Sequence, residues 1–443
     1  MPLLEEATLL GDVSLNVPVV VIGNGPSGIC LSYLLSGYRP FMASGAVHPN
    51  PILHNKLEEG IHFSVVDQMM EGSMLTISLN NWMELPGLKL KDWTNGKWRN
   101  LMNDRATTEE LASYYKDYVK IMGLQKNFID NTCVTSVSKI QQDQKCAKGK
   151  MPKSVKIDST TPQLFTPDNG LPPSLWEVRG YQRIGDGSHV PFCLYAENVV
   201  LATGTYDLPA RLGVEGEDLP FVFHNVSAFE LAVQSCKVGQ ASDPVLVVGA
   251  GLTAADAVLC AHRHSVPVVH AFRKSVTDPA LIFKQLPKKL YPEYHKVYHK
   301  MCKQGYINTS HSNYTSFPET RIVSFLPDMK CTLQPTSGRN IVLSISMALV
   351  LIGTYPNLSF LKEHGKHLGL DPSKPISCKQ NPIDINPYTF ECTKEDNIFA
   401  MGPLIGDNFV RFLKGGALGI TSCLVKRLKE KGQLISETGS DDG

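Results

Sequence analysis

The sequence of 443 residues has no long apolar run, no strong net charge and no closely spaced pair of cysteines. No apolar run reaches the roughly 18 residues that a membrane-spanning helix needs, so the sequence predicts no membrane span. The formal net charge of +1 gives the chain no overall attraction to nucleic acid or to an anionic membrane surface. The first residues are acidic, unlike the basic and then apolar start of a signal peptide.

The eleven cysteines are scattered along the chain, and none forms a C-x-x-C pair. This usage predicts reduced thiols in an intracellular protein, with the cytoplasm as the expected compartment. The missing C-x-x-C pair also excludes the simplest form of a dithiol–disulphide flavin reductase.

Residue patterns for metal or nucleophilic catalysis are missing as well. His295 and His299 are four residues apart, but no glutamate completes a zinc-protease motif, and no other ligand pair has convincing spacing. No G-x-S-x-G nucleophile elbow occurs. Lysines and tyrosines alternate over residues 284–303, a mixture that is compatible with nucleic-acid binding, but the spacing of Tyr294 and Tyr298 favours a solvated helix. The sequence therefore predicts no metal ion and no nucleic-acid partner.

The first strand–loop–helix pattern of the chain carries three glycines. The short apolar run Val19–Ile22 suits a strand that is buried on both faces. Gly23, Gly25 and Gly28 follow with G-x-G-x-x-G spacing, and an apolar helical pattern continues to Leu35. In a dinucleotide-binding unit these glycines allow a tight turn, the approach of a diphosphate and helix–strand packing, and the helix N-terminus attracts the anion. A glycine-rich turn in an ordinary α/β domain is the alternative interpretation.

The usual continuation of such a unit is missing. A Rossmann unit places an acidic residue about 20 residues after its glycines, where it binds a ribose. There is no Asp or Glu between Gly28 and Glu58, and the expected position falls near His48, in a stretch typical of a loop. We therefore expect the next strand of this unit to be displaced or absent.

A second strand–loop–helix pattern repeats the first over Pro244–Cys260. Gly249, Gly251 and Ala254 have G-x-G-x-x-A spacing between an apolar strand and a helix. Two such units in one chain predict two nucleotide cofactors, whereas either motif alone is compatible with a simple turn.

The strand that follows the second motif, Pro267–Phe272, ends in the two bases Arg273 and Lys274. They stand where a dinucleotide unit reads the ribose: an acid there suits the free 2′-hydroxyl of NAD, and a base favours the 2′-phosphate of NADP. We prefer Arg273 because a guanidinium binds phosphate through two N–H groups. A solvated strand end is the alternative interpretation.

Several further strands are expected from short apolar or alternating runs. Trp176–Ile184 and His189–Leu194 flank a Gly-Asp-Gly turn and indicate a β-meander. Glu197–Gly204 and Ser344–Gly353 are apolar strands that stop at a glycine.

The last apolar strand, residues 398–401, leads to Gly402, and Asp407 follows. A Gly-Gly pair comes next, and the pattern predicts a helix from about Ala417 to Lys429. The N-terminal dipole of such a helix could stabilise charge on an electron-accepting ring.

These patterns predict an α/β fold class with two Rossmann-like dinucleotide-binding domains and a β-meander. The expected domains are an FAD-binding domain in two parts, 15–220 and 340–435, an NADPH-binding domain, 221–339, and a disordered tail, 436–443.

The glycine loops GNGPSG and GAGLTA, the Ala202-Thr203-Gly204 segment and a last strand that ends near Gly402 and Asp407 resemble flavin-dependent monooxygenases with two dinucleotide domains. More closely, the chain resembles the oxidative stress-induced growth inhibitor family. The stretches that carry this resemblance are GNGPSGICLSYLLSGYRP, RGYQRIGDGSHVPFC, GLTAADAVLCA, TDPALIFKQLPKKLYPEYHKVYHKMC and GDNFVRFLKGGALG. The resemblance implies an intracellular NADPH- and FAD-dependent monooxygenase that is linked to growth control, cell division and germ-cell maturation through meiosis.

The resemblance also implies roles for individual residues. Those implied at the FAD site are Gly23, Gly25, Gly28, Gly204, Gly402 and Asp407, the last on the ribityl or phosphate side of the flavin. Those implied at the NADPH site are Gly249, Gly251, Ala254 and Arg273, the last on the 2′-phosphate. The implied partners are O2, an unidentified small-molecule substrate and regulatory proteins, and no catalytic acid–base pair need be visible because the cofactor carries the chemistry.

The chain departs from the family at one place. Family members carry a strand and a Gly-Gly-x-Trp loop, which embraces the flavin, between the segments around Gln68 and Glu71, and this chain runs directly from one segment to the other. The alternative hypothesis is therefore a non-catalytic growth-regulatory protein on a flavoprotein scaffold, its FAD site damaged by a deletion near residues 68–71. A third hypothesis is a flavin reductase that yields only peroxide.

Overall fold

The structure is a computed structural model. It describes residues 15–38, 78–93, 105–140, 175–303 except Asp186, and 313–430 except Ser337. The loop expected near His48, the junction at residues 68–71 and the tail 436–443 lie outside the described residues.

The chain divides into two compact units, Met1–Thr205 with Pro356–Gly443, and Tyr206–Tyr355. These boundaries differ from those predicted at 220/221 and 339/340. The reason is pairing that no local pattern reveals: β5 (Leu208–Pro209) pairs antiparallel with β14 (Thr354–Tyr355), so both strands belong to the second unit.

The first unit contains the first glycine motif and the last strand. Its described helices and strands are β1 (Leu15–Ile22), α1 (Pro26–Leu35), α3 (Leu90–Trp93), α4 (Thr108–Ile121), β2 (Thr132–Ile140), β3 (Leu175–Arg183), β4 (His189–Leu201), β15 (Ile398–Ala400) and α9 (Val410–Glu430). Short 3₁₀ turns lie at Asn80–Trp82, Gln125–Asn127, Lys362–Leu368 and Gly402–Ile405.

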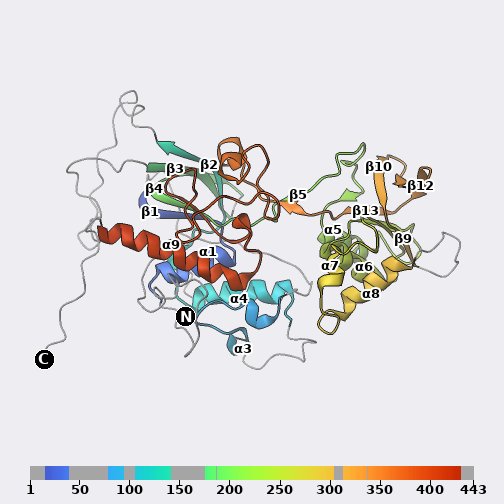
Figure 1. Ribbon diagram of the computed structural model, residues 1–443, viewed down its shortest axis with the longest axis horizontal. Coiled ribbons are helices and arrows are strands. Elements are labelled where there is room, and N and C mark those ends of the chain that lie inside the picture. The colour runs from blue at the N-terminus through green and yellow to red at the C-terminus, as the bar shows by residue number, and fades with distance from the viewer. Residues whose placement is uncertain are drawn as a thin grey trace. The chain divides into compact units, whose positions relative to one another are not determined.

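Strand β4 is the centre of the sheet in this unit (Figure 1). Its first half pairs antiparallel with β3, which pairs with β2, and this is the predicted meander. Its second half pairs parallel with β1 on one edge and with β15 on the other. The two strands expected at His189–Leu194 and Glu197–Gly204 are therefore one continuous strand, because the chain passes from the meander into the parallel part without a turn.

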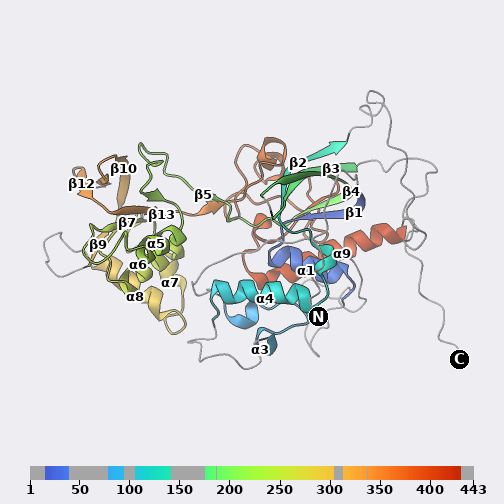
Figure 2. The same cartoon turned by 180° about the vertical axis from the view of Figure 1, so that it is seen from behind.

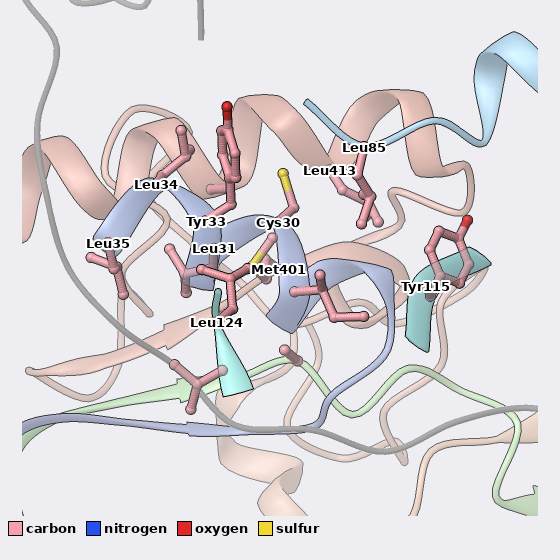
Figure 3. Packing of buried hydrophobic residues seen from close by; sticks show 14 of the residues in the cluster. Cys30, Leu31, Tyr33, Leu34, Leu35, Leu85, Tyr115, Leu124, Met401 and Leu413 are labelled. Carbon is pink, nitrogen blue, oxygen red and sulfur yellow. The ribbon is translucent and has the colours of Figure 1, made fainter. Parts of the chain in front are cut away.

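Both faces of the parallel part are buried, which explains the unbroken apolar run in β1. Val21 packs with α1 and α9 on one face, while Val20 and Ile22 pack on the other face in a second cluster. In both views α1 and α9 lie side by side (Figures 1 and 2). Figure 3 shows Leu31 of α1 in the cluster that also holds Leu413 of α9. This packing positions the start of α1 at the carboxyl end of β1.

Helix α4 begins at a well-defined cap. Thr107 is the N-cap, and its side chain and that of Glu110 form a reciprocal capping box. Tyr115 and Tyr118 of this helix are buried in the core.

The second unit contains the second glycine motif. Its described helices and strands are β5, β6 (Val222–Phe223), α5 (Val226–Gln234), β7 (Val245–Val248), α6 (Leu252–Arg263), β8 (Val268–Ala271), α7 (Ile282–Gln285), α8 (Pro292–Cys302), β9 (Tyr314–Phe317), β10 (Thr320–Leu326), β11 (Lys330–Pro335), β12 (Ile341–Ser344), β13 (Met347–Val350) and β14.

Its main sheet is parallel throughout, with the order β6-β13-β7-β8-β9. This is the Rossmann arrangement, in which the chain leaves β7 at the centre, builds β8 and β9 on one side, and returns to the other side. Strands β10, β11 and β12 form an antiparallel meander that packs on one face of this sheet. The predicted fold class, two Rossmann-like domains with a β-meander, is confirmed.

Candidate functional site

The first glycine loop is tightly joined to the end of β4. Gly23 has φ +107°, and a Cβ on it would lie 2.5 Å from the carbonyl carbon and oxygen of Ala202, so no other residue fits there without a shift. Gly25 is the N-cap of α1, and a Cβ on it would meet no atom within 4 Å. Gly28 is buried in the first turn of α1. The loop therefore combines a close contact at its first glycine with open space at its second.

Polar groups at this loop suit an anionic ligand. Helix α1 has neither a side-chain cap nor an acidic residue in its first turn. Its N-terminus carries about half a positive charge. The Nδ2 atom of Asn24 and the Oγ1 atom of Thr203 are buried and have no hydrogen-bond partner among the described residues. Because a buried polar atom without a partner is costly, these two atoms mark where a bound molecule would supply one. The residues present fit a dinucleotide diphosphate.

The remaining predicted residues of the first unit lie near the same loop. Gly402 has φ +69°, and a Cβ on it would lie 2.5 Å from Oγ of Ser27 in α1. The backbone N–H of Asp407 donates to the Gly402 carbonyl at 3.2 Å, and burial raises the pKa of the Asp407 carboxyl. Gly204, with φ +71°, follows the end of β4 and has open space at its Cβ position. The carboxyl ends of β1, β4 and β15 thus bring these residues together.

Helix α9 corrects one prediction. It begins at Val410, not near Ala417, so the Gly-Gly pair lies inside the helix. The glycines of this stretch serve packing: a Cβ on Gly419 would lie 2.6 Å from the Phe390 ring, and one on Gly416 would lie 3.2 Å from it. Close approach of the Phe390 ring, which no local pattern reveals, explains why these helical positions are glycine.

The second glycine loop repeats this geometry in the second unit. Gly249 has φ +130°, and a Cβ on it would lie 2.3 Å from the Leu351 carbonyl oxygen and 3.6 Å from Cβ of Ala254. Gly251 is the N-cap of α6, with nothing within 4 Å of its Cβ position. Helix α6 also lacks a side-chain cap and an acidic residue in its first turn. The second loop thus fits a diphosphate as well as the first.

The two bases after β8 differ in availability. The Nζ of Lys274 donates to the Ala280 carbonyl at 3.0 Å and lies 3.5 Å from a carboxylate oxygen of Asp278. Arg273 is exposed and makes no hydrogen bond or ion pair with the described residues. The backbone N–H of Gly249 donates to the Ala271 carbonyl at 3.0 Å, and Arg273 stands two residues after Ala271. Of the two bases, Arg273 is the one whose donors are unused within the described residues.

A buried histidine also contacts the second loop. His270 in β8 is 0% exposed, and its Nε2 lies 2.7 Å from the Gly249 carbonyl oxygen. Its Nδ1 lies 2.7 Å from the hydroxyl oxygen of Tyr314 in β9. Burial lowers the pKa of His270 to about 4, so the ring is neutral at physiological pH.

Sequence reasoning missed Asn24, Thr203 and His270. A histidine in the middle of the apolar strand PVVHAF was a usable signal, because a polar residue in a strand buried on both faces needs partners. Asn24 and Thr203 carried no signal beyond standing next to the glycines.

Two further observations concern the described residues only. No helix among them is long and apolar enough to cross a membrane. Within the same ranges, no group of three or more His, Cys, Asp or Glu side chains is placed to hold a metal ion.

Known proteins resemble this chain both in sequence and in fold. Residues 193–376 match the family of pyridine nucleotide-disulphide oxidoreductases. The human oxidative stress-induced growth inhibitor 2 is 53% identical over 509 aligned positions, which cover 100% of both chains. A bacillithiol disulfide reductase from Bacillus cereus has a similar fold, with a TM-score of 0.59, 16% identity and coverage of 93% of this chain and 99% of its own. An L-lysine 6-monooxygenase from Pseudomonas syringae has a TM-score of 0.56, 14% identity and coverage of 92% and 99%.

The two Rossmann units and their glycine loops define the class: the fold is that of the FAD- and NAD(P)-binding flavoprotein reductases and monooxygenases. Within this class, the full-length match places the chain more narrowly. The chain belongs to the oxidative stress-induced growth inhibitor family.

Proposed function

We propose that this protein is an NADPH- and FAD-dependent monooxygenase that uses O2, acts on an unidentified small-molecule substrate and regulates growth. The observation that carries the proposal is the pair of glycine loops, each closed at its first glycine and open at its second, at the start of a helix with no cap and no acid. The growth-regulatory part rests on the name of the human relative. Cell division, meiosis and an intracellular location remain predictions from the resemblance.

In the first unit the chain holds the FAD. The open side of Gly25 admits the diphosphate to the N-terminus of α1, and the amide of Asn24 and the hydroxyl of Thr203 gain the partners they lack. Asp407 contacts the ribityl or phosphate side of the cofactor, and Gly402, whose carbonyl accepts from the Asp407 N–H, belongs to the same site. When bound, FAD would supply hydride acceptance and reaction with O2.

In the second unit the chain holds the NADPH. Gly251 admits the coenzyme diphosphate to the N-terminus of α6, while Gly249 and Ala254 keep strand and helix in contact. Arg273 binds the 2′-phosphate, because its guanidinium is exposed and uses none of its donors within the described residues.

The missing C-x-x-C pair and the burial of Cys30 beside the first loop favour O2 over a disulphide as the electron acceptor. No C-x-x-C pair occurs in the sequence. Cys30, which lies in α1 just after the first loop, is fully buried, and burial raises its pKa to about 12. A thiol that stays protonated is a poor participant in thiol–disulphide exchange.

The test begins with the purified full-length protein. We expect flavin absorbance in the protein as isolated, NADPH oxidation in air, and less peroxide than NADPH consumed once the correct substrate is added. Peroxide equal to NADPH under every condition would support the flavin-reductase alternative. Absence of both bound flavin and NADPH oxidation would contradict the proposal.

One observation favours the non-catalytic alternative. The human relative aligns with this chain over 509 positions, whereas the chain has 443 residues, so the alignment leaves gaps in this chain. A regulatory scaffold predicts that Gly25→Trp and Gly251→Trp keep the cellular growth effect. The monooxygenase predicts that both variants lose it. The human relative, measured in parallel, serves as the reference for flavin content.

A further inference from the structure

The buried histidine of β8 joins three neighbouring strands of the second unit. Gly249 follows β7, His270 belongs to β8 and Tyr314 begins β9. The imidazole bridges the Gly249 carbonyl and the Tyr314 hydroxyl with two contacts of 2.7 Å. These two contacts connect the interior of the sheet with the second glycine loop.

The two partners determine which nitrogen carries the proton. A carbonyl oxygen can only accept, so Nε2 of His270 carries the hydrogen and donates it to Gly249. In the neutral ring Nδ1 then has only a lone pair, and the Tyr314 hydroxyl donates to it. His270 therefore accepts a hydrogen bond from the Tyr314 hydroxyl and donates one to the Gly249 carbonyl.

The direction of the Gly249 carbonyl sets the direction of the next N–H. A trans peptide is planar, so the Gly249 carbonyl and the Ala250 N–H point to opposite sides. With the carbonyl held by the buried imidazole, the Ala250 N–H points away from it. Glycine places few limits on its own dihedrals, so an unanchored peptide at this position could turn over. A hydrogen bond to the carbonyl removes that freedom.

We propose that His270 and Tyr314 are positioning residues for coenzyme binding, which hold the Gly249 carbonyl and thereby aim the Ala250 N–H at the coenzyme diphosphate. This inference rests on the proposed function, because it takes the second loop to bind a nicotinamide coenzyme. The diphosphate is common to NADH and NADPH, whereas the 2′-phosphate is not. The clamp therefore acts on both coenzymes equally, and Arg273 acts on NADPH alone.

The test compares two amide variants of His270 in the full-length protein. The side-chain nitrogen of glutamine reaches the position of Nε2, and that of asparagine reaches only the position of Nδ1. His270→Gln keeps the donor to Gly249, so we expect dissociation constants for NADPH and NADH within about twofold of the unmodified protein. His270→Asn loses the donor, and both constants should rise by about tenfold. Tyr314→Phe, which leaves Nδ1 without its donor, should give a smaller rise for both.

Three measurements separate positioning from a structural role. The ring nitrogens of His270, observed by 15N NMR, should show a neutral ring protonated at Nε2, and a ring protonated at Nδ1 would overturn the proposal. Thermal unfolding shows whether His270→Asn folds. If it does not fold, the coenzyme affinities of Tyr314→Phe and His270→Gln are compared instead. A folded His270→Asn with unchanged affinity for both coenzymes, or with a loss confined to NADPH, would also overturn it. If the unmodified protein binds neither coenzyme, the proposed function itself fails, and that outcome is distinct from binding that His270→Asn leaves unchanged.

Discussion

The two glycine loops have nearly the same local structure and different surroundings. Each begins with a glycine of positive φ, +107° at Gly23 and +130° at Gly249, and each has its second glycine at a helix N-cap beside open space. The second loop follows β7, a central strand with β13 on one edge and β8 on the other. The first follows β1, which has β4 on one edge and no strand on the other within the described ranges.

This difference separates the part of the site that the glycine pattern determines from the part that the neighbouring strand supplies. The pattern determines the turn and the helix start, because only glycine tolerates both the positive φ and the backbone contact. The residues that would read a ribose come from the next strand. In the second unit the proposed ribose-reading residue, Arg273, follows that strand, whereas in the first unit the corresponding stretch lies outside the described residues.

The largest effect should come from replacing the first glycine of each loop with alanine, because that glycine lies against backbone atoms. The second glycine of each loop lies beside open space and serves as the control. Gly249→Ala and Gly23→Ala place a methyl group 2.3 Å and 2.5 Å from backbone atoms at positive φ, so we expect each to lower the free energy of unfolding by about 3 kcal/mol or more. Gly251→Ala and Gly25→Ala meet no atom within 4 Å and should leave thermal unfolding of the cofactor-free protein almost unchanged. Equal melting temperatures for the two kinds of variant would contradict the comparison.

The next largest effect is expected at acidic pH, where protonation of His270 in the unfolded chain should lower the stability of the second unit. His270 titrates near its ordinary pKa of 6.5 when unfolded and at about 4 when folded. Between these values the unfolded chain binds the extra proton, so the stability of the second unit falls by about 3 kcal/mol as the pH drops from 6.5 to 4. Urea unfolding at several pH values measures this slope. In His270→Gln the slope over this window should be shallower, and an identical slope would refute the assignment.

A smaller and more selective effect is expected at the base after β8. Arg273→Gln removes the guanidinium, and we expect the dissociation constant for NADPH to rise by about tenfold or more, with NADH binding unchanged. Lys274→Gln is the matched control, because Lys274 already bonds Ala280 and Asp278, and it should change NADPH binding by about twofold at most. Titration of both variants with NADPH and NADH measures these constants. A larger loss of NADPH affinity in Lys274→Gln than in Arg273→Gln would assign the 2′-phosphate to Lys274 instead.

The smallest effect belongs to the first loop. Thr203→Val removes a buried hydroxyl that has no partner among the described residues, so the cofactor-free protein should keep its stability or gain up to about 1 kcal/mol. The same variant should bind FAD more weakly if the hydroxyl gains its partner from the cofactor. Thermal unfolding with and without added FAD measures both, and a clear loss of stability without FAD would show that the hydroxyl serves the fold.

Much of the fold could be predicted because it depends on short stretches of sequence. The apolar runs before Gly23 and Gly249, the positions of the glycines and the base after β8 all depend on residues within a few positions of one another. The predicted strand at residues 398–401 is likewise confirmed as β15, one residue shorter. The predicted helix start after the Gly-Gly pair is wrong, because α9 begins at Val410, and Gly416 and Gly419 let it approach Phe390.

The sequence by itself determined the two strand–glycine–helix turns, since handedness, backbone freedom and apolar periodicity act locally. Only the tertiary structure decided that β4 is one strand shared by meander and parallel sheet, and that the second unit runs from Tyr206 to Tyr355. It alone joined Tyr314, His270 and Gly249, which lie far apart in the chain. The physical reason is that hydrogen bonds between strands depend on which chain segments the core brings side by side, and no short stretch of sequence contains that information.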